Sequence, residues 1–520
     1  MLVSDIVRRN AIYYGNLEAV VVPGVRSTTW GALEERTNQL GRALLDLGLG
    51  KGDRLATFMP NGAEYIDFFF ACAKTGIIGS TSNIRLTGED LTKYLSYVEP
   101  SAILVHADLV EQSGWVRNIV SIRHVIGVGS GHGLDLDLEE LISAADSSDP
   151  GCRIGDDDVY QLGATSGTTG TPKGAVLSHR NAIAAMLNWM AEMPIPTGGT
   201  NLQNIPMFFN PGGPAGLHPV LMKGGRTVIS SAFEPGQFLS SVPEFGVTHS
   251  ILVPTMIGMV LNHPECGQHD LSSLMGVSIG GSPLPRDTLA RARKVFGDVF
   301  FPLYGMAETY SCGTILRRED QFTEGTPEQV RRLASIGKPN VLMQVRVVGE
   351  DGEDIPRDER TPGEIWMRGD SVSSGYFRLP EETAASYEGD WMKSGDVGVM
   401  DAEGFVTIVD RSKDIIITGG INVFSREIEE VLHDHQAVAQ VAVIGIPHER
   451  WGEAIHAVVV LAPGAAATPA ELLEHAAAHL ADYKKPRSVE IVASLPLGST
   501  GKILKRELRE PYWEGRGRAV

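Results

Sequence analysis

Residues 163–174 read Gly-Ala-Thr-Ser-Gly-Thr-Thr-Gly-Thr-Pro-Lys-Gly, a segment with four glycines, five hydroxyl side chains and one lysine. Glycine permits positive φ angles and lets a ligand approach the main chain closely. Hydroxyls and free backbone N–H groups can surround phosphate oxygens, and Lys173 adds a positive charge. A strand is expected at residues 159–162, and Ser178 is expected to cap a helix that begins near Arg180. The pattern predicts a mobile phosphate-binding loop between a strand and a helix, and a flexible surface loop is the alternative.

The segment differs from the phosphate loop of P-loop NTPases. That motif requires Gly, Lys and Ser or Thr in direct succession. Here Pro172 precedes Lys173 and Gly174 follows it. The sequence therefore indicates a phosphate-binding loop of another kind.

Composition narrows the class of protein. The chain has 520 residues, enough for several domains, and its 42% hydrophobic and 21% charged residues are typical of globular enzymes. A net charge of −19 argues against nucleic acid and anionic membranes as partners, and an anionic substrate such as ATP would need local positive groups. The longest apolar run, residues 251–261, contains Pro254 and is too short to span a bilayer. The N-terminus lacks signal-peptide character, and we expect a cytoplasmic protein without a membrane span.

The four cysteines show no ligand spacing. They are separated along the chain, and neither a C-x-x-C nor an H-E-x-x-H motif occurs. Reduced, buried thiols are the expected state. The cysteines are Cys72, Cys152, Cys266 and Cys312.

Alternating helix-like and strand-like segments characterise residues 1–310. This alternation predicts layered α/β structure with parallel strands. Helices are expected at residues 33–47, 65–75 and 285–296, and strands at residues 54–58, 102–105, 226–230, 250–253 and 298–301.

The pattern changes twice further along the chain. Residues 341–348, 363–367 and 404–409 are rich in β-formers and predict an antiparallel sheet or a distorted, barrel-like part. Beyond residue 410 a small α+β domain is expected, and the charged tail past Lys502 is expected to be loosely held. Its helices are predicted at residues 425–433 and 469–481, and its strands at 438–444, 455–461 and 489–492. The predicted domains are therefore residues 1–410 and 411–520.

A second chemical segment follows the expected strand at 298–301. Residues 301–309 read Phe-Pro-Leu-Tyr-Gly-Met-Ala-Glu-Thr. The ring of Tyr304 could stack on a purine, and the carboxylate of Glu308 could bind Mg²⁺, which proteins often hold with one or two carboxylates plus substrate phosphates. Taken alone, Glu308 is more often an exposed surface acid.

Residues 276–280 match the G-x-S-x-G pattern of the α/β-hydrolase nucleophile elbow. The elbow requires an immediate strand-to-helix turn and an oxyanion loop. Pro283 and Pro285 interrupt the expected helix start, and no HGGG-like loop occurs. The sequence therefore argues against a hydrolase.

Four segments together are similar to the signatures of one family. Besides residues 163–174 and 304–309, they are Arg-Ser-Lys-Asp-Ile-Ile-Ile-Thr-Gly-Gly-Ile-Asn-Val at 411–423 and Pro-Leu-Gly-Ser-Thr-Gly-Lys at 496–502. They resemble the motifs of the adenylate-forming superfamily, which comprises acyl-CoA synthetases, luciferases and peptide-synthetase adenylation domains. The resemblance extends over nearly the whole chain. It implies a large N-terminal domain and a small, mobile C-terminal domain.

The resemblance also implies roles for individual residues. Catalytic roles fall to Lys502, Glu308, Thr165 and Lys173, with Glu308 as the Mg²⁺ ligand. ATP or AMP would contact Thr165, Ser166, Gly167, Thr168, Thr169, Gly170, Thr171, Lys173, Gly281, Ser282, Pro283, Tyr304, Gly305, Met306, Thr309, Asp396, Arg411 and Lys502. The acyl pocket would involve Phe209, Asn210, Gly280, Gly281 and Met306. Lys413 would be the hinge, and Gly419 and Gly420 would line the CoA tunnel.

Less specific explanations exist for three of these positions. Asp396 alone could belong to an Asx turn, and Gly419 and Gly420 could form an ordinary hairpin turn. A lysine on a glycine-rich loop, such as Lys502, is usually solvated. The family motifs favour the functional roles.

The chain departs from the family at one position. After Pro206-Met207-Phe208 the family often has a histidine beside the acyl site, whereas this chain has Phe209. We hypothesise that Phe209 walls the acyl pocket and that the small residues after it leave space for a bulky or cyclic acid.

The resemblance implies an ATP- and Mg²⁺-dependent ligase that forms an acyl-AMP from a small-molecule carboxylic acid and transfers the acyl group to the thiol of coenzyme A. The expected acid is medium-sized to bulky and hydrophobic, aromatic or cyclic. The alternative is an acyl-AMP ligase that passes the adenylate to a carrier protein or a partner enzyme. A luciferase and an inactive binding protein are less favoured, and a monomer or a homodimer fits equally well.

Overall fold

The computed structural model describes residues 1–86, 88–165, 173–281, 284–497 and 503–514. The chain divides into two compact units, the first comprising Met1–Val345 and Met367–Met392 and the second Arg346–Trp366 and Lys393–Val520. The chain crosses between them inside β17 (Met343–Val348), β18 (Gly363–Gly369) and β20 (Trp391–Met400). The boundary expected between residues 410 and 411 stays a prediction.

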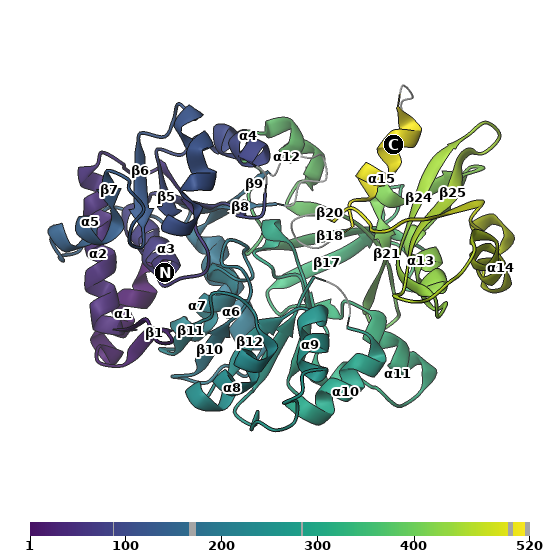
Figure 1. Cartoon of the computed structure of the whole chain (residues 1–520), viewed down its shortest axis with the longest axis horizontal. Helices are drawn as coiled ribbons and strands as arrows, with labels where there is room; N and C mark the ends of the chain where they lie inside the picture. Colours follow the sequence, from purple (N-terminus) through teal and green to yellow (C-terminus); the bar gives the residue numbers. More distant parts are fainter. Residues whose placement is uncertain (87, 166–172, 282–283, 498–502, 515–520) are drawn as a thin grey trace. The chain divides into compact units, whose positions relative to one another are not determined.

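The first unit contains two mainly parallel sheets with helices packed on them (Figure 1). The first sheet has the order β16-β15-β14-β13-β12-β10-β11-β1-β2, and the second β7-β6-β5-β3-β4-β8-β9. Strands of the first sheet are β1 (Glu18–Val22), β2 (Arg26–Thr29), β10 (Thr200–Gln203), β11 (Arg226–Ile229), β12 (His249–Leu252), β13 (Gly276–Ile279), β14 (Phe300–Tyr304), β15 (Thr314–Ile315) and β16 (Lys338–Pro339). Strands of the second are β3 (Arg54–Phe58), β4 (Ile78–Thr81), β5 (Ala102–His106), β6 (His124–Val128), β7 (Leu136–Asp137), β8 (Val159–Ala164) and β9 (Gly174–Ser178). The expected α/β class is confirmed.

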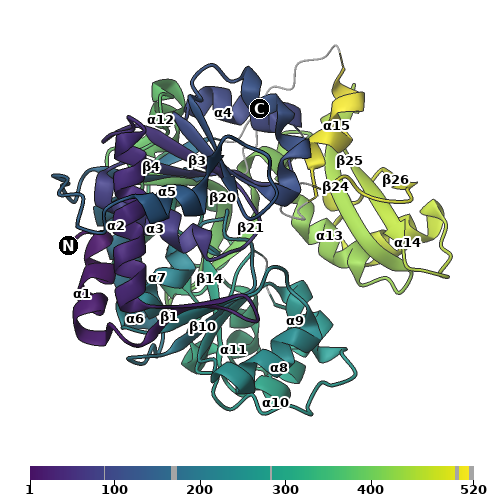
Figure 2. The same ribbon diagram turned by 60° about the vertical axis from the view of Figure 1, so that its left-hand side comes forward.

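The helices expected at residues 33–47, 65–75 and 285–296 are confirmed as α2, α3 and α10. In both views α1 and α2 lie side by side, and α3 lies next to α2 (Figure 1 and Figure 2). The α-helices are α1 (Ser4–Tyr14), α2 (Trp30–Asp46), α3 (Glu64–Thr75), α4 (Gly88–Val98), α5 (Leu138–Ala144), α6 (His179–Glu192), α7 (Pro214–Met222), α8 (Pro235–Phe245), α9 (Pro254–Leu261), α10 (Arg286–Phe296), α11 (Pro327–Arg331) and α12 (Pro380–Ser386). Turns of 3-10 helix are η1 (Ala107–Leu109), η2 (Glu111–Asn118), η3 (Ala307–Thr309), η4 (Arg318–Asp320) and η5 (Arg332–Ala334).

The core of the first unit surrounds α3. Every residue of this helix from Tyr65 to Thr75 is buried, including Phe68, Phe69 and Phe70. A helix that is buried on every side is stable only when its apolar residues are packed and its polar ones, here Asp67 and Lys74, are paired. The helix ends at Gly76, whose φ of 74° is the left-handed conformation that glycine adopts most readily.

The β-rich region forms a sheet of order β17-β18-β20-β19, with β21 paired to β20. Two of its strands have not been given above: β19 (Tyr387–Glu388) and β21 (Val406–Arg411). The small α+β region contains a sheet of order β23-β22-β25-β24 with β26 parallel to β25. Its elements are β22 (Ile416–Thr418), β23 (Ile421–Val423), β24 (Val438–His448), β25 (Gly452–Leu461), β26 (Ser488–Ile491), α13 (Ser425–His433), α14 (Pro469–His479), α15 (Lys505–Trp513), η6 (Ser412–Asp414) and η7 (Asp482–Lys484). This region has its own apolar core between α13, α14 and the sheet.

The expectation of a loosely held tail past Lys502 is wrong for residues 503–514. They include α15, which two basic residues attach to the second unit. Lys505 pairs with Glu429 at 2.7 Å, and Arg509, 9% exposed, pairs with Asp414 at 3.0 Å. These ion pairs stabilise a helix that was not expected from its charged sequence and Pro511.

Candidate active site

The glycine- and threonine-rich segment is the connection of a β-hairpin. Strand β8 pairs antiparallel with β9, and Ala164 lies opposite Gly174. At the base of the connection Thr165 N donates to Lys173 O at 2.8 Å, and Lys173 N donates to Thr165 Oγ1 at 3.3 Å. The sequence analysis expected a helix directly after the loop and missed β9, in which the buried side chains of Ala175 and Leu177 alternate with less buried ones. The loop ends are therefore held together by the sheet.

The expected helix cap is confirmed. Ser178 is the N-cap of α6, and its Oγ accepts from Asn181 N at 3.2 Å. The helix begins at His179, one residue before the expected start. Several predicted site residues lie outside the described part of the chain: Ser166, Gly167, Thr168, Thr169, Gly170, Thr171, Ser282, Pro283 and Lys502.

Glu308 lies on the short turn η3, directly after β14. The residue is only 8% exposed, and its Oε1 accepts a hydrogen bond from the hydroxyl of Tyr376 at 2.7 Å. Its backbone O accepts from Ser373 N at 2.6 Å. The carboxylate that the sequence analysis assigned to the metal is thus partly buried and oriented, unlike the exposed surface acid of the less specific explanation.

The turn around Glu308 is tightly constrained. Tyr310 and Ser311 have φ angles of 54° and 63°, a conformation uncommon for residues other than glycine. A Cβ at Gly305 would lie 2.6 Å from the backbone C of Ser311, so only glycine fits there. The Tyr310 hydroxyl donates to Gln161 Oε1 of β8 at 3.0 Å, which connects this turn to the strand before the loop.

Lys173 is paired within the same unit. Its Nζ forms a salt bridge with Glu382 of α12 and lies 5.1 Å from the ring centroid of Tyr376. A cation over an aromatic face is attracted by the ring quadrupole. Lys173, Tyr376 and Glu308 therefore form a continuous chain of contacts between the base of the loop and the predicted metal ligand.

Tyr376 and Glu382 were missed by the sequence analysis. They belong to a segment about 200 residues after the loop that adds to β9: Val176 N donates to Gly375 O, and Phe377 N donates to Gly174 O, each at 2.9 Å. The available signal was Gly375-Tyr376 followed by the helix-start pattern Pro380-Glu381-Glu382. Nothing local in that pattern indicates that the segment returns to the loop.

The residues expected at the acyl pocket are brought partly together. Phe209 packs on Phe208 with ring centroids 4.6 Å apart, and Asn210 Nδ2 donates to Ala307 O at 3.2 Å. Asn210 thereby connects this segment to the turn that carries Met306 and Glu308. Gly280 and Gly281 follow β13, and Gly281 has a φ of 88°.

Two of the small residues after Phe209 are glycines that the close packing of their own backbone requires. A Cβ at Gly212 would lie 2.1 Å from Pro206 O, and one at Gly216 would lie 2.0 Å from Pro211 O. The hypothesis that the small residues leave room for a bulky acid stays a prediction.

The hydrolase interpretation is excluded by the position of Ser278. This serine lies within strand β13, is 2% exposed, and its hydroxyl donates to Met193 Sδ at 3.2 Å. A nucleophile elbow requires an exposed serine on a sharp turn.

In the second unit Asp396 and Arg411 lie opposite each other on β20 and β21. Arg411 Nε is 3.4 Å from Asp396 Oδ1, and Asp396 is 8% exposed. Gly419 and Gly420, with φ angles of 60° and 79°, form the turn between β22 and β23, as in the hairpin alternative. Their CoA-tunnel role stays a prediction.

Lys413 lies on η6 beside Asp414. Burial lowers the pKa of Lys413 to about 8, with a smaller opposing effect from the negative charge of Asp414. Arg509 of α15 donates to the backbone O of Lys413 at 2.9 Å. The predicted hinge residue is therefore attached to the last helix of the chain.

The described residues fit a metal ion shared with substrate. Within residues 1–86, 88–165, 173–281, 284–497 and 503–514, no group of three or more His, Cys, Asp or Glu side chains could hold a metal ion. Mg²⁺ commonly takes one or two carboxylates and completes its shell with phosphates and water, so the single carboxylate of Glu308 fits this ion. The same described residues contain no helix with the length and apolarity needed to cross a membrane.

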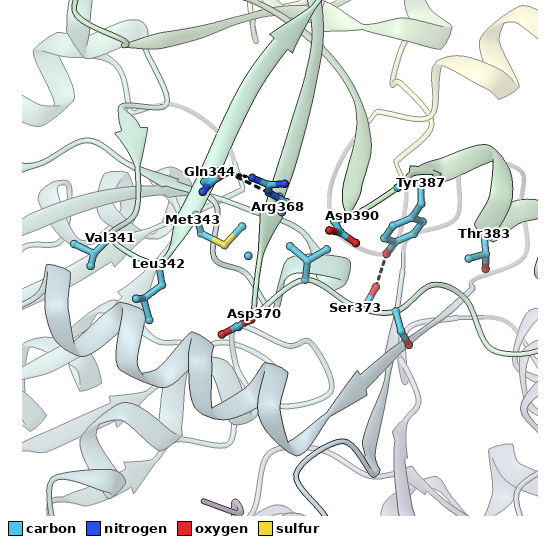
Figure 3. Close-up of a pocket in the computed structure, with 14 residues that line it drawn as sticks. Val341, Leu342, Met343, Gln344, Arg368, Asp370, Ser373, Thr383, Tyr387 and Asp390 are labelled. Carbon is cyan, nitrogen blue, oxygen red and sulfur yellow. Dashed lines mark hydrogen bonds between the residues drawn. The ribbon is translucent and has the colours of Figure 1, made fainter. Parts of the chain in front are cut away.

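A cavity of about 820 Å³ with polar and apolar lining residues lies in the first unit (Figure 3). Arg368, Asp370 and Asp390 line it, together with Ser373 and Tyr387, whose hydroxyls are 2.6 Å apart. Of the described residues that line this cavity, none is a predicted site residue. The cavity adjoins the site through Ser373, whose backbone N contacts Glu308.

Comparisons with known proteins show the family of this chain. Residues 7–377 match the AMP-binding enzyme family, and residues 427–502 match the AMP-binding enzyme C-terminal domain. The chain is 35% identical over 489 residues to a feruloyl-CoA synthase of Amycolatopsis sp., covering 94% of this chain and 95% of the relative. It is 33% identical over 524 residues to a medium/long-chain-fatty-acid–CoA ligase of Mycobacterium tuberculosis, covering 96% and 88%.

The fold agrees with that of a solved structure. The o-succinylbenzoate CoA synthetase of Bacillus subtilis in complex with its acyl-adenylate intermediate superposes with a TM-score of 0.85 at 26% identity, covering 97% of both chains. The chain belongs to the AMP-binding, adenylate-forming enzyme family, and it is an AMP-forming acid–thiol ligase that activates a carboxylic acid with ATP and transfers the acyl group to coenzyme A.

Proposed function

We propose that the acid is medium-sized to bulky and hydrophobic, aromatic or cyclic. The observation that supports this proposal is the pair Phe208 and Phe209, whose rings pack at a tilt of 59°, next to Asn210, which contacts the turn bearing Met306 and Glu308. Aromatic side chains supply large apolar contact area to a ligand. The relative named for feruloyl-CoA supports an aromatic acid, and the relative named for fatty acids supports an aliphatic one.

The first half-reaction joins two anions. A carboxylate oxygen of the acid attacks the α-phosphorus of ATP, the bond to the β-phosphate oxygen breaks, and pyrophosphate leaves. We assign triphosphate binding to residues 165–173, with Lys173 as a cation, adenine stacking to Tyr304, and ribose binding to Asp396. Arg411 would contact the ribose or the phosphates. Mg²⁺, when bound at Glu308, would supply charge neutralisation for the phosphates.

Lys502 is proposed to stabilise the charge that develops between the carboxylate and the α-phosphate. In the second half-reaction the CoA thiol attacks the acyl carbon, and AMP leaves as a much weaker base than oxide. Rotation about Lys413 would exchange Lys502 for the thiol channel at Gly419 and Gly420. Transfer to a carrier protein remains the alternative for this step, and the cytoplasmic location and oligomeric state stay predictions.

The test is a panel of acids assayed for pyrophosphate release with and without CoA, followed by mass detection of the thioester. We expect release and a thioester with aromatic or longer aliphatic acids. Preference for acetate or propionate would overturn the proposed acid class. Acid-dependent release without thioester would favour the carrier-protein alternative. Lys502→Ala should slow the first half-reaction by about 10²–10³.

A further inference from the structure

Tyr376 lies between the two charged residues proposed for the triphosphate site. Its hydroxyl donates to Glu308 Oε1 at 2.7 Å, and its ring centroid is 5.1 Å from Lys173 Nζ. A hydrogen bond to an ionised carboxylate is about twice as strong as one between neutral groups. One side chain thus contacts both the proposed metal ligand and the proposed phosphate-binding cation.

The backbone around Tyr376 is fixed by its neighbours. Tyr376 forms an antiparallel bridge with Ala175 of β9, and its N donates to Thr383 Oγ1 at 2.9 Å. Gly375 has a φ of 127°, and a Cβ there would lie 2.3 Å from Thr383 Cγ2. The bridge to Ala175, the hydrogen bond to Thr383 and the close packing of Gly375 together hold Tyr376 in one place relative to the base of the loop.

We propose that Tyr376 is a positioning residue for the metal–triphosphate site, in which its hydroxyl orients the Glu308 carboxylate and its ring supports Lys173. This inference rests on the roles proposed above for Glu308 and Lys173. Loss of the hydroxyl removes the 2.7 Å hydrogen bond that orients Oε1 of the carboxylate. Loss of the ring additionally removes the surface on which Lys173 lies.

Two substitutions separate these contributions. Tyr376→Phe removes the hydroxyl and keeps the ring, whereas Tyr376→Leu removes both. Tyr387→Phe is the matched control, because its hydroxyl belongs to the same segment but contacts Ser373. ATP binding is measured by calorimetry in Mg²⁺ and in EDTA, and pyrophosphate release is measured as a function of Mg²⁺ concentration.

We expect Tyr376→Phe to reduce kcat/KM by about 10- to 100-fold, the range for a hydrogen bond to a charged group. It should also lose most of the Mg²⁺-dependent gain in ATP affinity while binding ATP in EDTA like the wild type. Tyr376→Leu should bind ATP about 2- to 10-fold more weakly even in EDTA, because the cation–π contact is gone. Tyr387→Phe should keep the wild-type Mg²⁺ dependence.

Failures of the two proposals are distinguishable. If the wild type is active and Tyr376→Phe has the same Mg²⁺ dependence as Tyr387→Phe, the positioning role is overturned and the ligase assignment stands. If the wild type releases no pyrophosphate with any acid but Tyr376→Phe weakens Mg²⁺-dependent ATP binding, the acid proposal falls and the positioning role stands.

Discussion

Two lysines of the first unit, Lys74 and Lys173, each pair with a glutamate, but their surroundings differ. Lys74 on α3 has a completely buried side chain and contacts Glu34 Oε2 at 2.7 Å, Asn38 Oδ1 at 2.6 Å and the backbone O of Glu34 at 3.2 Å. Lys173 has a side chain that is 17% exposed, and that of its partner Glu382 is 45% exposed. A ligand can replace an exposed counter-ion, whereas it cannot reach a buried one. The complete burial of Lys74, together with the lower exposure of Glu34 (18%) than of Glu382 (45%), therefore separates a structural lysine from one that can serve a substrate.

The largest expected effect is on stability. Lys74→Met should destabilise the first unit by about 3–5 kcal/mol, because it leaves Glu34 and Asn38 without their buried partner. Urea denaturation measures the loss, and kcat per folded molecule should remain at the wild-type value. A stable variant with reduced kcat would contradict the structural role of Lys74.

Lys173 should show the opposite behaviour. Lys173→Met should reduce pyrophosphate release by about 10²-fold, or about 3 kcal/mol, because a cation at the phosphates is lost. Its urea midpoint should change little, since exposed ion pairs contribute about 0–1 kcal/mol. An equal loss of stability in both lysine variants would remove the distinction between them.

Three buried histidines allow the same contrast between structural and substrate-binding groups to be tested through the pH dependence of stability. Burial lowers the pKa of His218 to about 3 and of His179 and His249 to about 4, below the unfolded value of 6.5. The contribution of these histidines to the free energy of unfolding should be fully present above pH 6.5. It should fall as the pH drops toward 4, because the unfolded state then binds more protons than the folded state. Each histidine contributes a slope of about 1.4 kcal/mol per pH unit.

The variant that tests this is His218→Gln. It should reduce the slope of the unfolding free energy against pH, at acidic pH, by the contribution of one proton. His218 stacks on Phe70 in the core, with ring centroids 5.1 Å apart. The His218→Gln variant should therefore keep the wild-type pH profile of activity. A shifted activity profile would show that His218 replaces the histidine expected at Phe209.

The smallest expected effect concerns the counter-ion of Lys173. Glu382→Gln should lower the KM for ATP by about 2- to 5-fold, because the carboxylate no longer competes with phosphate, and the gain is limited to about 1 kcal/mol by its exposure. Steady-state kinetics measures this change. Glu381→Gln, an exposed neighbour on α12, is the control and should leave KM unchanged. A higher KM in Glu382→Gln alone would indicate that Glu382 holds Lys173 in place for ATP.

Local patterns predicted much of the fold. Ser178 was recognised as a helix cap from its own neighbourhood, and α3 was expected as a buried helix over residues 65–75. Strand β9 was missed because Gly174–Ser178 is short and follows a glycine-rich segment. Helix α15 was missed because its stability depends on Glu429 and Asp414, which are distant in sequence.

The sequence by itself determined the chemistry of the site: a glycine- and threonine-rich loop with a lysine, a carboxylate after a strand, and the family to which these motifs belong. Tertiary structure alone decided which charged residues face each other. Tyr376 and Glu382 reach Glu308 and Lys173 only because a segment about 200 residues after the loop adds to β9. Side-chain pairing across such separations depends on packing, which a local pattern of residue types does not specify.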